Sequence, residues 1–393
     1  MIALCQSPRG PDFVQNPYPF YARARARGAL HLWQDYAMPA AFGHDLVMRL
    51  FRDRRLGREC PAELARPWPD HLAPFAAVET HSMLELEPPR HTRLRGLVLR
   101  AFTSARVAAL APAITALCHD LIDRFPDRPF DLLAQYCAPV PVITIARLLG
   151  VPETAAPQLL DWSHAMVAIY QAGRDRAIED AAARAAAEFS AFLRAHVAAR
   201  RTAPGADLIT TLIAAEADGD RLSTEELIAT CILLLNAGHE ATVHALGNGV
   251  KAILEQGADP AWTGAAMVAA TVEEILRHDP PLHMFTRHVY EPLEIAGHRL
   301  ARGDRVALLL GAANRDPARW PDPDRFDPTR PGLAHAAFGG GLHFCVGAPL
   351  ARLEMRIALQ VLFARCPNLA LAAPPRYADS YHFHGLERLM VTR

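Results

Sequence analysis

The chain has 393 residues, of which 51% are hydrophobic and 21% are charged, and its formal net charge is −1 at pH 7. This length is enough for a large buried core, and the proportions are those of a globular protein, which argues against a disordered chain. Because charges of both signs are dispersed, no overall basic field favours binding to nucleic acid or to an anionic membrane.

No targeting segment or cysteine cluster stands out in the sequence. The beginning, MIALCQSPRGPDF, has no long apolar run, and no later stretch offers about 20 uninterrupted apolar residues. The protein is therefore expected to be cytoplasmic and without a membrane anchor. Its seven cysteines are scattered, with no C-x-x-C or C-x-x-C-H spacing, so disulfides, a zinc ribbon and c-type haem attachment lose support.

Helical periodicity dominates the chain. Apolar residues recur at spacings of three and four with charged residues between them, which is typical of amphipathic helices. Such helices are predicted over 105–125, 179–201 and 349–366.

The longest predicted helix begins at Ser223 and runs to Gly257. Ser223 can cap it while Glu226, three residues on, completes a capping box. Its first half is apolar on every face and should be buried, yet N-A-G-H-E-A-T then places polar residues in mid-helix. Because an unpartnered buried polar group costs about 1–3 kcal/mol, we expect a ligand or water at that point.

The C-terminal half contains a β-like region and a long coil. Short runs over 286–310, broken by Glu-Pro, Ala-Gly and Arg-Gly-Asp, predict a small antiparallel sheet. From 312 to 338 the chain is rich in Pro and Asp, and a coil this long inside a folded chain is usually a functional loop. No internal repeat or flexible linker is evident, so one large domain over 1–393 is expected.

Residues 338–347, FGGGLHFCVG, place a lone cysteine after three glycines. A metal-binding thiolate at Cys345 would need its charge stabilised, and the helix expected to begin near Gly347, with Pro349 in its first turn, would direct free N–H groups at the sulfur. The glycines allow positive φ and close approach to a flat ligand. One thiolate cannot build a tetrahedral zinc site, whereas haem needs only one. A glycine-rich turn around a buried cysteine explains these residues equally well.

The longer segment FGGGLHFCVGAPLARLE resembles the cysteine-ligand signature of the cytochrome P-450 superfamily, F-x-x-G-x-[RH]-x-C-x-G followed by L-A-R-x-E. Phe338, Gly341, His343, Cys345 and Gly347 fill every defined position. The resemblance implies a mainly α fold with a smaller β region, and haem b held by Cys345. It also implies a monooxygenase that inserts one oxygen atom from O2 into a C–H bond of a small hydrophobic substrate.

Glu274 and Arg277 match the E-x-x-R pair of the same superfamily. In the superfamily this pair joins the core to the coil through buried charged hydrogen bonds, and the i to i+3 spacing puts both side chains on one helix face. A solvated ion pair is the alternative for these residues alone, but the coil that follows, with ANRDP and FDP, favours the buried pair.

Four donors are expected by resemblance to bind the haem propionates. His91 and Arg95 match H-x-x-x-R and lie one helical turn apart, and Arg287 and His343 complete the set. Without such donors the propionate charge is costly to bury. For the His-Arg pair alone, a solvated surface position is the alternative.

The long helix departs from the superfamily pattern where it is expected to pass over the iron. The pattern A-G-x-[ED]-T has its acid at Glu240, but Ala241 occupies the threonine position and Thr242 follows it. Since each residue turns the helix by about 100°, Thr242 cannot replace the missing hydroxyl unless the helix bulges. A peroxide-driven, NO-reducing or substrate-assisted enzyme is therefore one alternative to ordinary oxygen activation, and a haem sensor without turnover is another.

The same helix also invites comparison with the zinc-peptidase motif H-E-x-x-H. His239 and His244 are five residues apart, which separates them by about 140° around the helix, so the two cannot share one metal. We expect His239 to be packed or pocket-lining, and His244 to lie on a helix face.

By resemblance, the substrate pocket is lined by the 60–84 loop, the long helix, the start of the β region and the C-terminal segment. Apart from the loop, the expected residues are Leu234, Ala237, Gly238, His283, Met284, Phe285, His382 and Phe383. Most are apolar or aromatic, so a hydrophobic guest is expected.

Electrons are expected from an external protein. No Rossmann fingerprint, P-loop or iron–sulfur cysteine set is present, so a ferredoxin or a flavodoxin-like carrier is implied. Scattered solvated arginines are one reading of the basic residues near the cysteine, and a docking face is the other. That face would comprise Arg93, Arg100, Arg106, Arg352 and Arg356.

Overall fold

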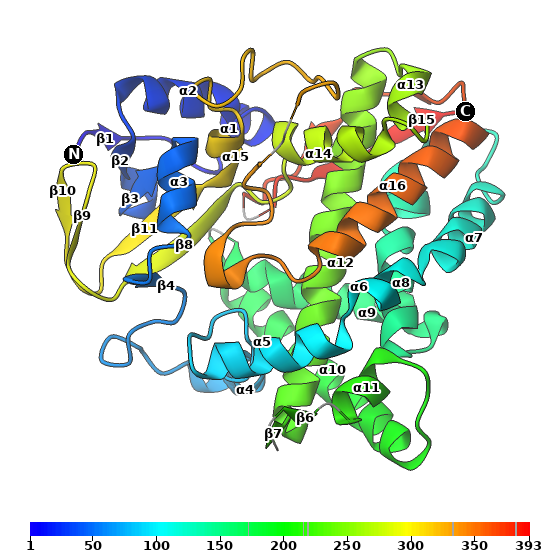
Figure 1. Cartoon of the computed structure of the whole chain (residues 1–393), viewed down its shortest axis with the longest axis horizontal. Coiled ribbons are helices and arrows are strands. Elements are labelled where there is room, and N and C mark those ends of the chain that lie inside the picture. The colour runs from blue at the N-terminus through cyan, green and yellow to red at the C-terminus, as the bar shows by residue number, and fades with distance from the viewer. Residues whose placement is uncertain (172, 215, 218–219, 332–333, 382) are drawn as a thin grey trace.

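A helix-rich part and a β-rich part make up the molecule, and the N-terminus lies in the β-rich part (Figure 1). The computed structural model describes residues 1–393 apart from 172, 215, 218–219, 332–333 and 382. The helices are α1 (Pro11–Gln15), α2 (Tyr18–Arg27), α3 (His44–Leu50), α4 (Ala73–Glu79), α5 (Arg90–Ala101), α6 (Ser104–Ala108), α7 (Ala111–Ile122), α8 (Pro139–Leu149), α9 (Ala156–Val167), α10 (Arg176–Thr202), α11 (Leu208–Ala214), α12 (Thr224–Glu255), α13 (Pro260–Thr263), α14 (Val268–His278), α15 (Leu310–Asn314) and α16 (Ala348–Arg365). The expectation of a mainly helical fold with a smaller β region is confirmed.

The strands are short and cluster in several sheets. They are β1 (Ala3–Leu4), β2 (Leu30–Trp33), β3 (Met38–Ala41), β4 (Leu56–Gly57), β5 (Phe130–Asp131), β6 (Glu216–Ala217), β7 (Asp220–Arg221), β8 (Met284–Val289), β9 (Leu293–Ile295), β10 (His298–Leu300), β11 (Arg305–Leu309), β12 (Ala370–Leu371), β13 (Arg376–Tyr377), β14 (Leu386–Arg388) and β15 (Met390–Thr392).

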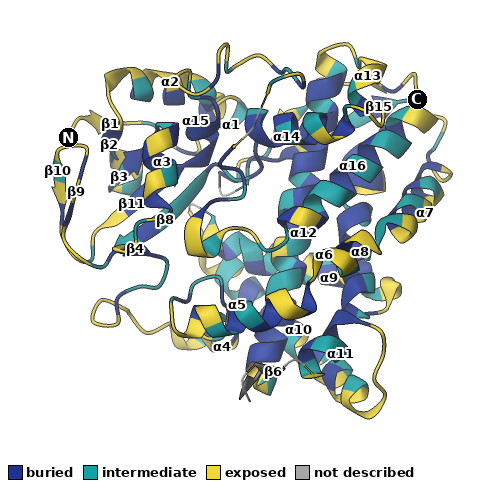
Figure 2. Ribbon diagram, viewed as in Figure 1, coloured by how far each residue is buried: buried dark blue, intermediate teal, exposed yellow. Residues whose placement is uncertain are grey.

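The long helix α12 forms as its sequence predicts. The Ser223 hydroxyl accepts a hydrogen bond from the Glu226 N–H, and the Glu226 carboxylate accepts one from the Ser223 N–H, which completes the capping box. The helix ends before Gly257, whose φ is +88°. It contacts α8, α10 and α14 and is buried along much of its length (Figure 2). These contacts explain why its first half is apolar on every face.

The predicted small antiparallel sheet over 286–310 is only partly right. β8 and β11 do pair antiparallel, but β11 also pairs parallel with β3, and the whole sheet has six strands in the order β1-β2-β3-β11-β8-β4. β9 and β10 form a separate hairpin. The local pattern cannot reveal the pairing with β3, because that strand lies far away in the sequence.

Two other boundaries differ from the sequence expectation. The amphipathic segment 105–125 is broken into α6 and α7, with Thr103 capping α6 and a proline in the first turn of α7. The predicted coil from 312 begins inside α15 (Leu310–Asn314). A break of this kind leaves the three- and four-residue spacing of apolar side chains intact, so periodicity alone does not detect it.

One segment among the described residues, Ser104–Ile122, is long and apolar enough to cross a membrane by length and composition alone. In the structure it comprises α6 and α7, and α7 packs against α16 with Ile114, Leu117 and Leu121 buried in the main hydrophobic core. The buried apolar residues of this segment therefore belong to the protein core.

Candidate active site

The loop before α16 holds Cys345 in a geometry suited to a thiolate. The Cys345 N–H donates to the Phe338 carbonyl at 3.1 Å, and the N–H groups of Gly347 and Ala348, at the start of α16, donate to the sulfur. Gly341 has a φ of +66°, and a Cβ there would overlap the Phe51 carbonyl. Only glycine therefore fits this turn without strain.

The surroundings of the Cys345 sulfur include groups that raise the pKa of the thiol and groups that lower it. Burial raises the pKa of the Cys345 thiol, whereas the N–H groups of Gly347 and Ala348 and the positive charges of Arg95 and Arg352 lower it. Cys345 nevertheless keeps solvent-accessible surface. These donors and charges favour a thiolate, and a bound metal cation would overcome the remaining cost of burial.

Beside this loop, α5 brings His91 against His343. Their ring centroids are 4.3 Å apart, and His343 Nε2 lies 2.9 Å from the Glu87 carboxylate. Burial lowers the pKa of His91 to about 4, with the charges of His343 and Arg95 acting in the same direction. The Nδ1 atom of His91 is buried and has no hydrogen-bond partner. An anionic ligand that accepts a hydrogen bond would satisfy it.

The other two expected donors approach from different elements. Arg95 on α5 donates to the Phe344 carbonyl at 2.6 Å, which ties α5 to the cysteine loop. Arg287 on β8 is 3% exposed, donates to the Thr286 carbonyl, and lies 5.1 Å from the centre of the Phe51 ring. The structure thus gathers all four predicted donors around the cysteine loop, α5 and β8.

Sequence reasoning missed Arg58, which follows β4 and matches none of the motifs. Its positive charge helps to lower the pKa of both His91 and His343. The pKa of Arg287 is lowered to about 10, mainly by burial and secondly by the charge of Arg58. Arg58 pairs with Glu85, but its Nε atom is buried without a partner. Such a concentration of donors and positive charge fits a ligand that carries carboxylates, as haem does.

Glu274 and Arg277 form a fully buried bidentate ion pair on α14. Arg277 Nε and Nη2 each lie 2.7 Å from a Glu274 oxygen. The remaining Arg277 donors reach the carbonyls of Asn314 and Pro323, and Glu274 accepts from the Asp327 N–H. The pair therefore joins α14 to the long coil that leads to the cysteine loop.

On α12, one stripe of side chains retains solvent-accessible surface in mid-helix. Ala237 is exposed and Leu234 and Ala241 are partly exposed, at spacings of three and four. Thr242 is buried, and its hydroxyl lies 3.5 Å from the Gly238 carbonyl in a helix that stays α-helical throughout. No bulge rotates Thr242 toward the stripe, so it does not replace the hydroxyl that Ala241 lacks.

The Glu240 carboxylate lies on a different face of α12 and is 4% exposed. His164 Nε2 on α9 is 3.2 Å from Oε1, His239 Nε2 is 3.5 Å from the same oxygen, and His244 Nε2 is 3.7 Å from Oε2. Burial raises the pKa of Glu240, but the three histidines, His239 foremost, outweigh it and hold the pKa below its usual range. Sequence reasoning did not anticipate the contribution of His164.

Three comparisons with known proteins place this geometry in a family. A sequence profile described as cytochrome P450 matches residues 265–368. The chain is 38% identical to the cytochrome P450 monooxygenase PikC of Streptomyces venezuelae, over 93% of this chain and 88% of PikC. It is also 38% identical to vitamin D(3) 25-hydroxylase of Pseudonocardia autotrophica, over 97% of this chain and 94% of that protein.

The chain belongs to the cytochrome P450 family.

The fold agrees with that membership. The crystal structure of P450BioI in complex with an acyl carrier protein that carries hexadec-9Z-enoic acid superposes with a TM-score of 0.91 at 33% identity, covering 97% of this chain and 99% of P450BioI. Its relatives include monooxygenases and hydroxylases over nearly their full length, so the protein is a cytochrome P450 monooxygenase, an oxidoreductase.

Within this cytochrome P450, one of the expected pocket residues lies elsewhere. His283 is 0% exposed, and its Nδ1 atom is 3.0 Å from the Tyr21 hydroxyl, so it packs in the core rather than lining a pocket. Gly238 is partly exposed, and a Cβ there would lie 3.4 Å from Ile145 of α8. The error at His283 concerns the direction in which a side chain points, which depends on the packing of distant elements.

The other expected pocket residues have mixed positions. Met284 and Phe285 at the start of β8 are partly exposed, as is Phe383, whose ring centroid is 5.4 Å from that of His244. His382 lies outside the described residues.

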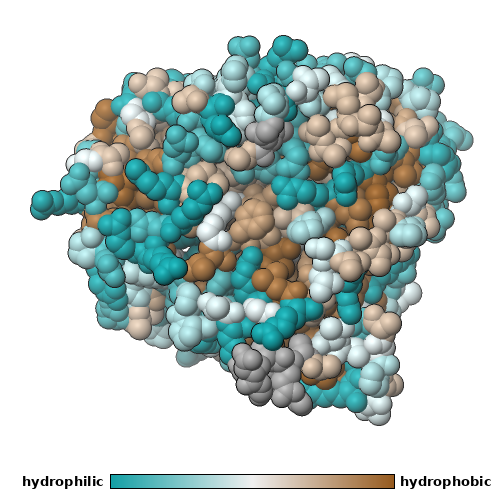
Figure 3. Space-filling model, viewed as in Figure 1, coloured by the Kyte–Doolittle hydropathy of each residue, from teal (hydrophilic) through white to brown (hydrophobic). Residues whose placement is uncertain are grey.

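Hydrophobic residues gather in the middle of one face of the molecule, over the cysteine loop and α5 (Figure 3). Exposed Leu99, Leu342 and Phe344 belong to these elements.

Proposed function

We propose that this cytochrome P450 holds haem b through the sulfur of Cys345. The family implies a haem cofactor. The observation that carries the assignment to Cys345 is the pair of N–H groups from Gly347 and Ala348 that donate to the sulfur. When bound, a thiolate-ligated haem supplies the chemistry of O–O bond cleavage that a monooxygenase needs.

The haem carboxylates would be held by the donors on α5, β8 and the cysteine loop. His91, Arg95, Arg287 and His343 are the proposed set, and Arg58 adds positive charge beside them. The unpartnered Nδ1 atom of His91 supports this role, because a carboxylate oxygen would supply the acceptor it lacks.

The proposed substrate is a small hydrophobic molecule in the cytoplasm. The stripe of Leu234, Ala237 and Ala241 on α12 offers an apolar surface, and Phe285 and Phe383 are also partly exposed. The names of the relatives are consistent with hydrophobic substrates, since one is a vitamin D(3) hydroxylase and another is shown with a fatty acid on its carrier protein.

The proposed electron donor is a ferredoxin or a flavodoxin-like protein that docks beside the cysteine loop. Arg100 is exposed on α5, and Arg106 on α6 is partly exposed. Arg93 instead pairs with Glu226, and Arg352 makes a bidentate pair with Glu273, so their charges are largely neutralised. The basic face is therefore smaller than the five arginines suggested, and exposed Leu99 supplies an apolar contact within it.

A second candidate function rests on Ala241. Because the accessible stripe of α12 carries no hydroxyl at position 241, ordered water or a hydroxyl of the substrate would have to take the place of that hydroxyl in proton delivery. The protein would then be a substrate-assisted monooxygenase, or an enzyme that is driven by peroxide or reduces NO.

The absorption spectrum of the reduced, CO-bound protein tests the cofactor assignment. We expect a strongly red-shifted Soret band typical of thiolate ligation, and a histidine-type band in fresh wild-type protein would contradict it. Turnover of apolar compounds with a ferredoxin system, compared with turnover on peroxide alone, separates the candidate reactions.

A further inference from the structure

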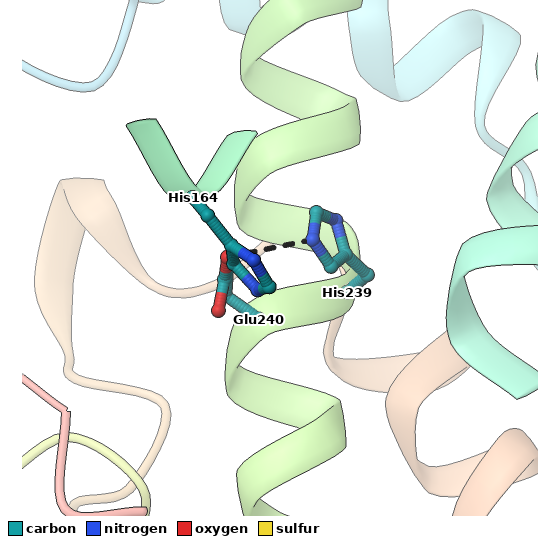
Figure 4. A group of neighbouring side chains, drawn as sticks. All are labelled: His164, His239 and Glu240. Carbon is teal, nitrogen blue, oxygen red and sulfur yellow. Dashed lines mark ion pairs between the residues drawn. The ribbon is translucent and has the colours of Figure 1, made fainter. Parts of the chain in front are cut away.

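Three potential metal ligands converge where α9 crosses α12. His164, His239 and Glu240 each offer one ligand atom, and these atoms all lie within 4.8 Å of one another. Figure 4 shows His164 arriving from a separate helix to meet the two residues of α12. His239 and Glu240 are 2% and 4% exposed, whereas the His164 side chain is 57% exposed. The cluster therefore has two buried ligands, His239 and Glu240, and one ligand that faces solvent, His164.

The hydrogen bonds of His239 determine which of its ring nitrogens carries the proton. His239 Nδ1 lies 2.6 Å from the Leu235 carbonyl, which can only accept, so Nδ1 carries the proton. In the neutral ring, Nε2 then presents a lone pair, and it lies 3.5 Å from Glu240 Oε1, which is itself an acceptor. Neither Nε2 nor Oε1 makes a hydrogen bond, although both are buried and His164 Nε2 lies 3.2 Å from Oε1. A cation between them would satisfy both.

We propose that His164, His239 and Glu240 form a binding site for Zn²⁺, with a fourth position open to solvent.

The ligand set and its spacing fit this ion. Two imidazoles and a carboxylate are a known zinc ligand set, and ligand atoms about 2.0–2.1 Å from a tetrahedral zinc lie about 3.3 Å apart. The distances from Glu240 Oε1 to His164 Nε2 and His239 Nε2 are 3.2 and 3.5 Å. The Leu235 carbonyl orients the His239 ring through the other nitrogen, as is usual for zinc-binding histidines.

His164 resolves the geometric objection that the α12 sequence raises against a metal. His239 and His244 point too far apart to share an ion, but His164 supplies the second imidazole from α9. His244 instead lies 3.7 Å from the other oxygen of Glu240, where it can orient the carboxylate. Bound Zn²⁺ would engage Glu240, so turnover that uses this carboxylate for proton transfer would fall as the site fills.

A second cluster in the molecule has the same ligand types and is not proposed as a site. Asp279, His283 and His384 also bring their ligand atoms within 4.8 Å of one another, and all three are buried. The Asp279 oxygens accept hydrogen bonds from the hydroxyls of Tyr18 and Tyr377 and contact His384 Nδ1 at 3.1 Å. The Asp279 carboxylate is thus already satisfied without an ion.

Equilibrium dialysis of the haem-loaded protein against Zn²⁺, followed by X-ray absorption at the zinc edge, tests the site. We expect one zinc ion bound per chain, with a first shell of nitrogen and oxygen that includes imidazole. His164→Gln should weaken the binding at least tenfold, and His239→Gln and Glu240→Gln should do the same. The matched control is His298→Gln on the hairpin of β9 and β10, which should bind zinc as the wild type does.

The variants must keep the CO-bound spectrum of the wild type, which shows that a loss of zinc is not a loss of fold or haem. Equal zinc binding by wild type and His164→Gln would overturn the proposal, as would a sulfur shell or no binding at all. If no zinc binds, the short distance between His239 and Glu240 is instead explained by an ion pair between an imidazolium and a carboxylate. Because zinc is counted directly, the amount bound does not depend on which residue holds the haem or on turnover.

Discussion

The cysteine side and the α12 side of the candidate haem site differ in how closely they follow the family pattern. On the cysteine side, each motif residue is present and tied to its neighbours through backbone contacts, as with Gly341 against Phe51 and the N–H groups at Cys345. On the α12 side, Ala241 lacks the hydroxyl and Glu240 lies among histidines.

The difference shows which functional groups of such a site can be replaced by water, by the substrate or by another residue type, and which cannot. A turn with positive φ and a thiolate next to a helix N-terminus have no replacement in another residue type or in water. A proton donor can be replaced by water or by a substrate hydroxyl. The cysteine side should therefore respond more severely to mutation than the α12 side, and the following changes test this ranking.

The largest effect is expected from Cys345→Ser. Loss of the thiolate should abolish the red-shifted band of the CO complex and reduce monooxygenase turnover below detection, because the electron donation that favours O–O cleavage is lost with the sulfur. The spectrum of the reduced, CO-bound variant measures the change. Cys5→Ser, at an exposed position, is the control and should leave the band in place. A surviving thiolate band in Cys345→Ser would refute the ligand assignment.

The next largest effect is on stability, through the buried pair of α14. Glu274→Gln leaves Arg277 as an unpaired buried cation and should lower the free energy of unfolding by about 3–5 kcal/mol. Denaturant unfolding of the haem-loaded protein measures this loss. Glu153→Gln, which breaks the partly exposed pair with Arg147, should cost no more than about 1 kcal/mol. Equal losses in the two variants would show that the α14 pair does not join core and coil.

On the α12 side, Ala241→Thr should improve rather than damage the enzyme. A hydroxyl on the accessible stripe would supply the missing proton donor, so less peroxide should form per electron consumed, by up to about 10²-fold. Ala241→Val has nearly the same shape without the hydroxyl and is the matched control. The ratio of product to peroxide with a ferredoxin system is the measurement. If the valine variant improves equally, pocket shape explains the gain.

A smaller, pH-dependent effect is expected at Glu273. Burial raises its pKa, but hydrogen bonds from Arg352 and His335 outweigh this and hold the pKa at about 2. A lowered pKa in the folded state stabilises the protein above the unfolded-state value of about 4.3, and this contribution is lost as the pH falls toward 2.

Glu273→Gln should therefore cost roughly 1 kcal/mol at pH 7, and its difference from wild type should begin to shrink below about pH 4.3. Unfolding free energies at pH 7, 5 and 3.5 measure this trend. Arg352 also lies 4.5 Å from the centre of the Phe338 ring, so the pair supports the cysteine loop. A difference that grows on acidification would contradict the assigned direction.

Several features of the molecule were predictable because their determinants are local. The capping box of Ser223 and Glu226 and the turn at Gly341 each depend on a few adjacent residues, and they form as expected. The E-x-x-R pair meets across one helical turn for the same reason. Backbone geometry and short-range hydrogen bonds operate over such distances whatever the rest of the chain does.

The positions that sequence reasoning misplaced depend on distant packing. The position of Arg58 near the proposed propionate donors follows from the pairing of β4 with β8, and the burial of His283 follows from its contact with Tyr21 of α2. Likewise, the mixed sheet requires β3 beside β11. The local spacing of apolar residues does not indicate which distant helix or strand a residue will contact.

By itself, then, the sequence determined the cysteine loop, the long helix with its alanine in place of threonine, and the family. Only the tertiary structure decided the partners of Glu240, because His164 reaches it from another helix. Helix periodicity predicts which residues share a face of a helix. The residue that contacts this face depends on how whole helices and strands pack, and this packing involves the entire chain.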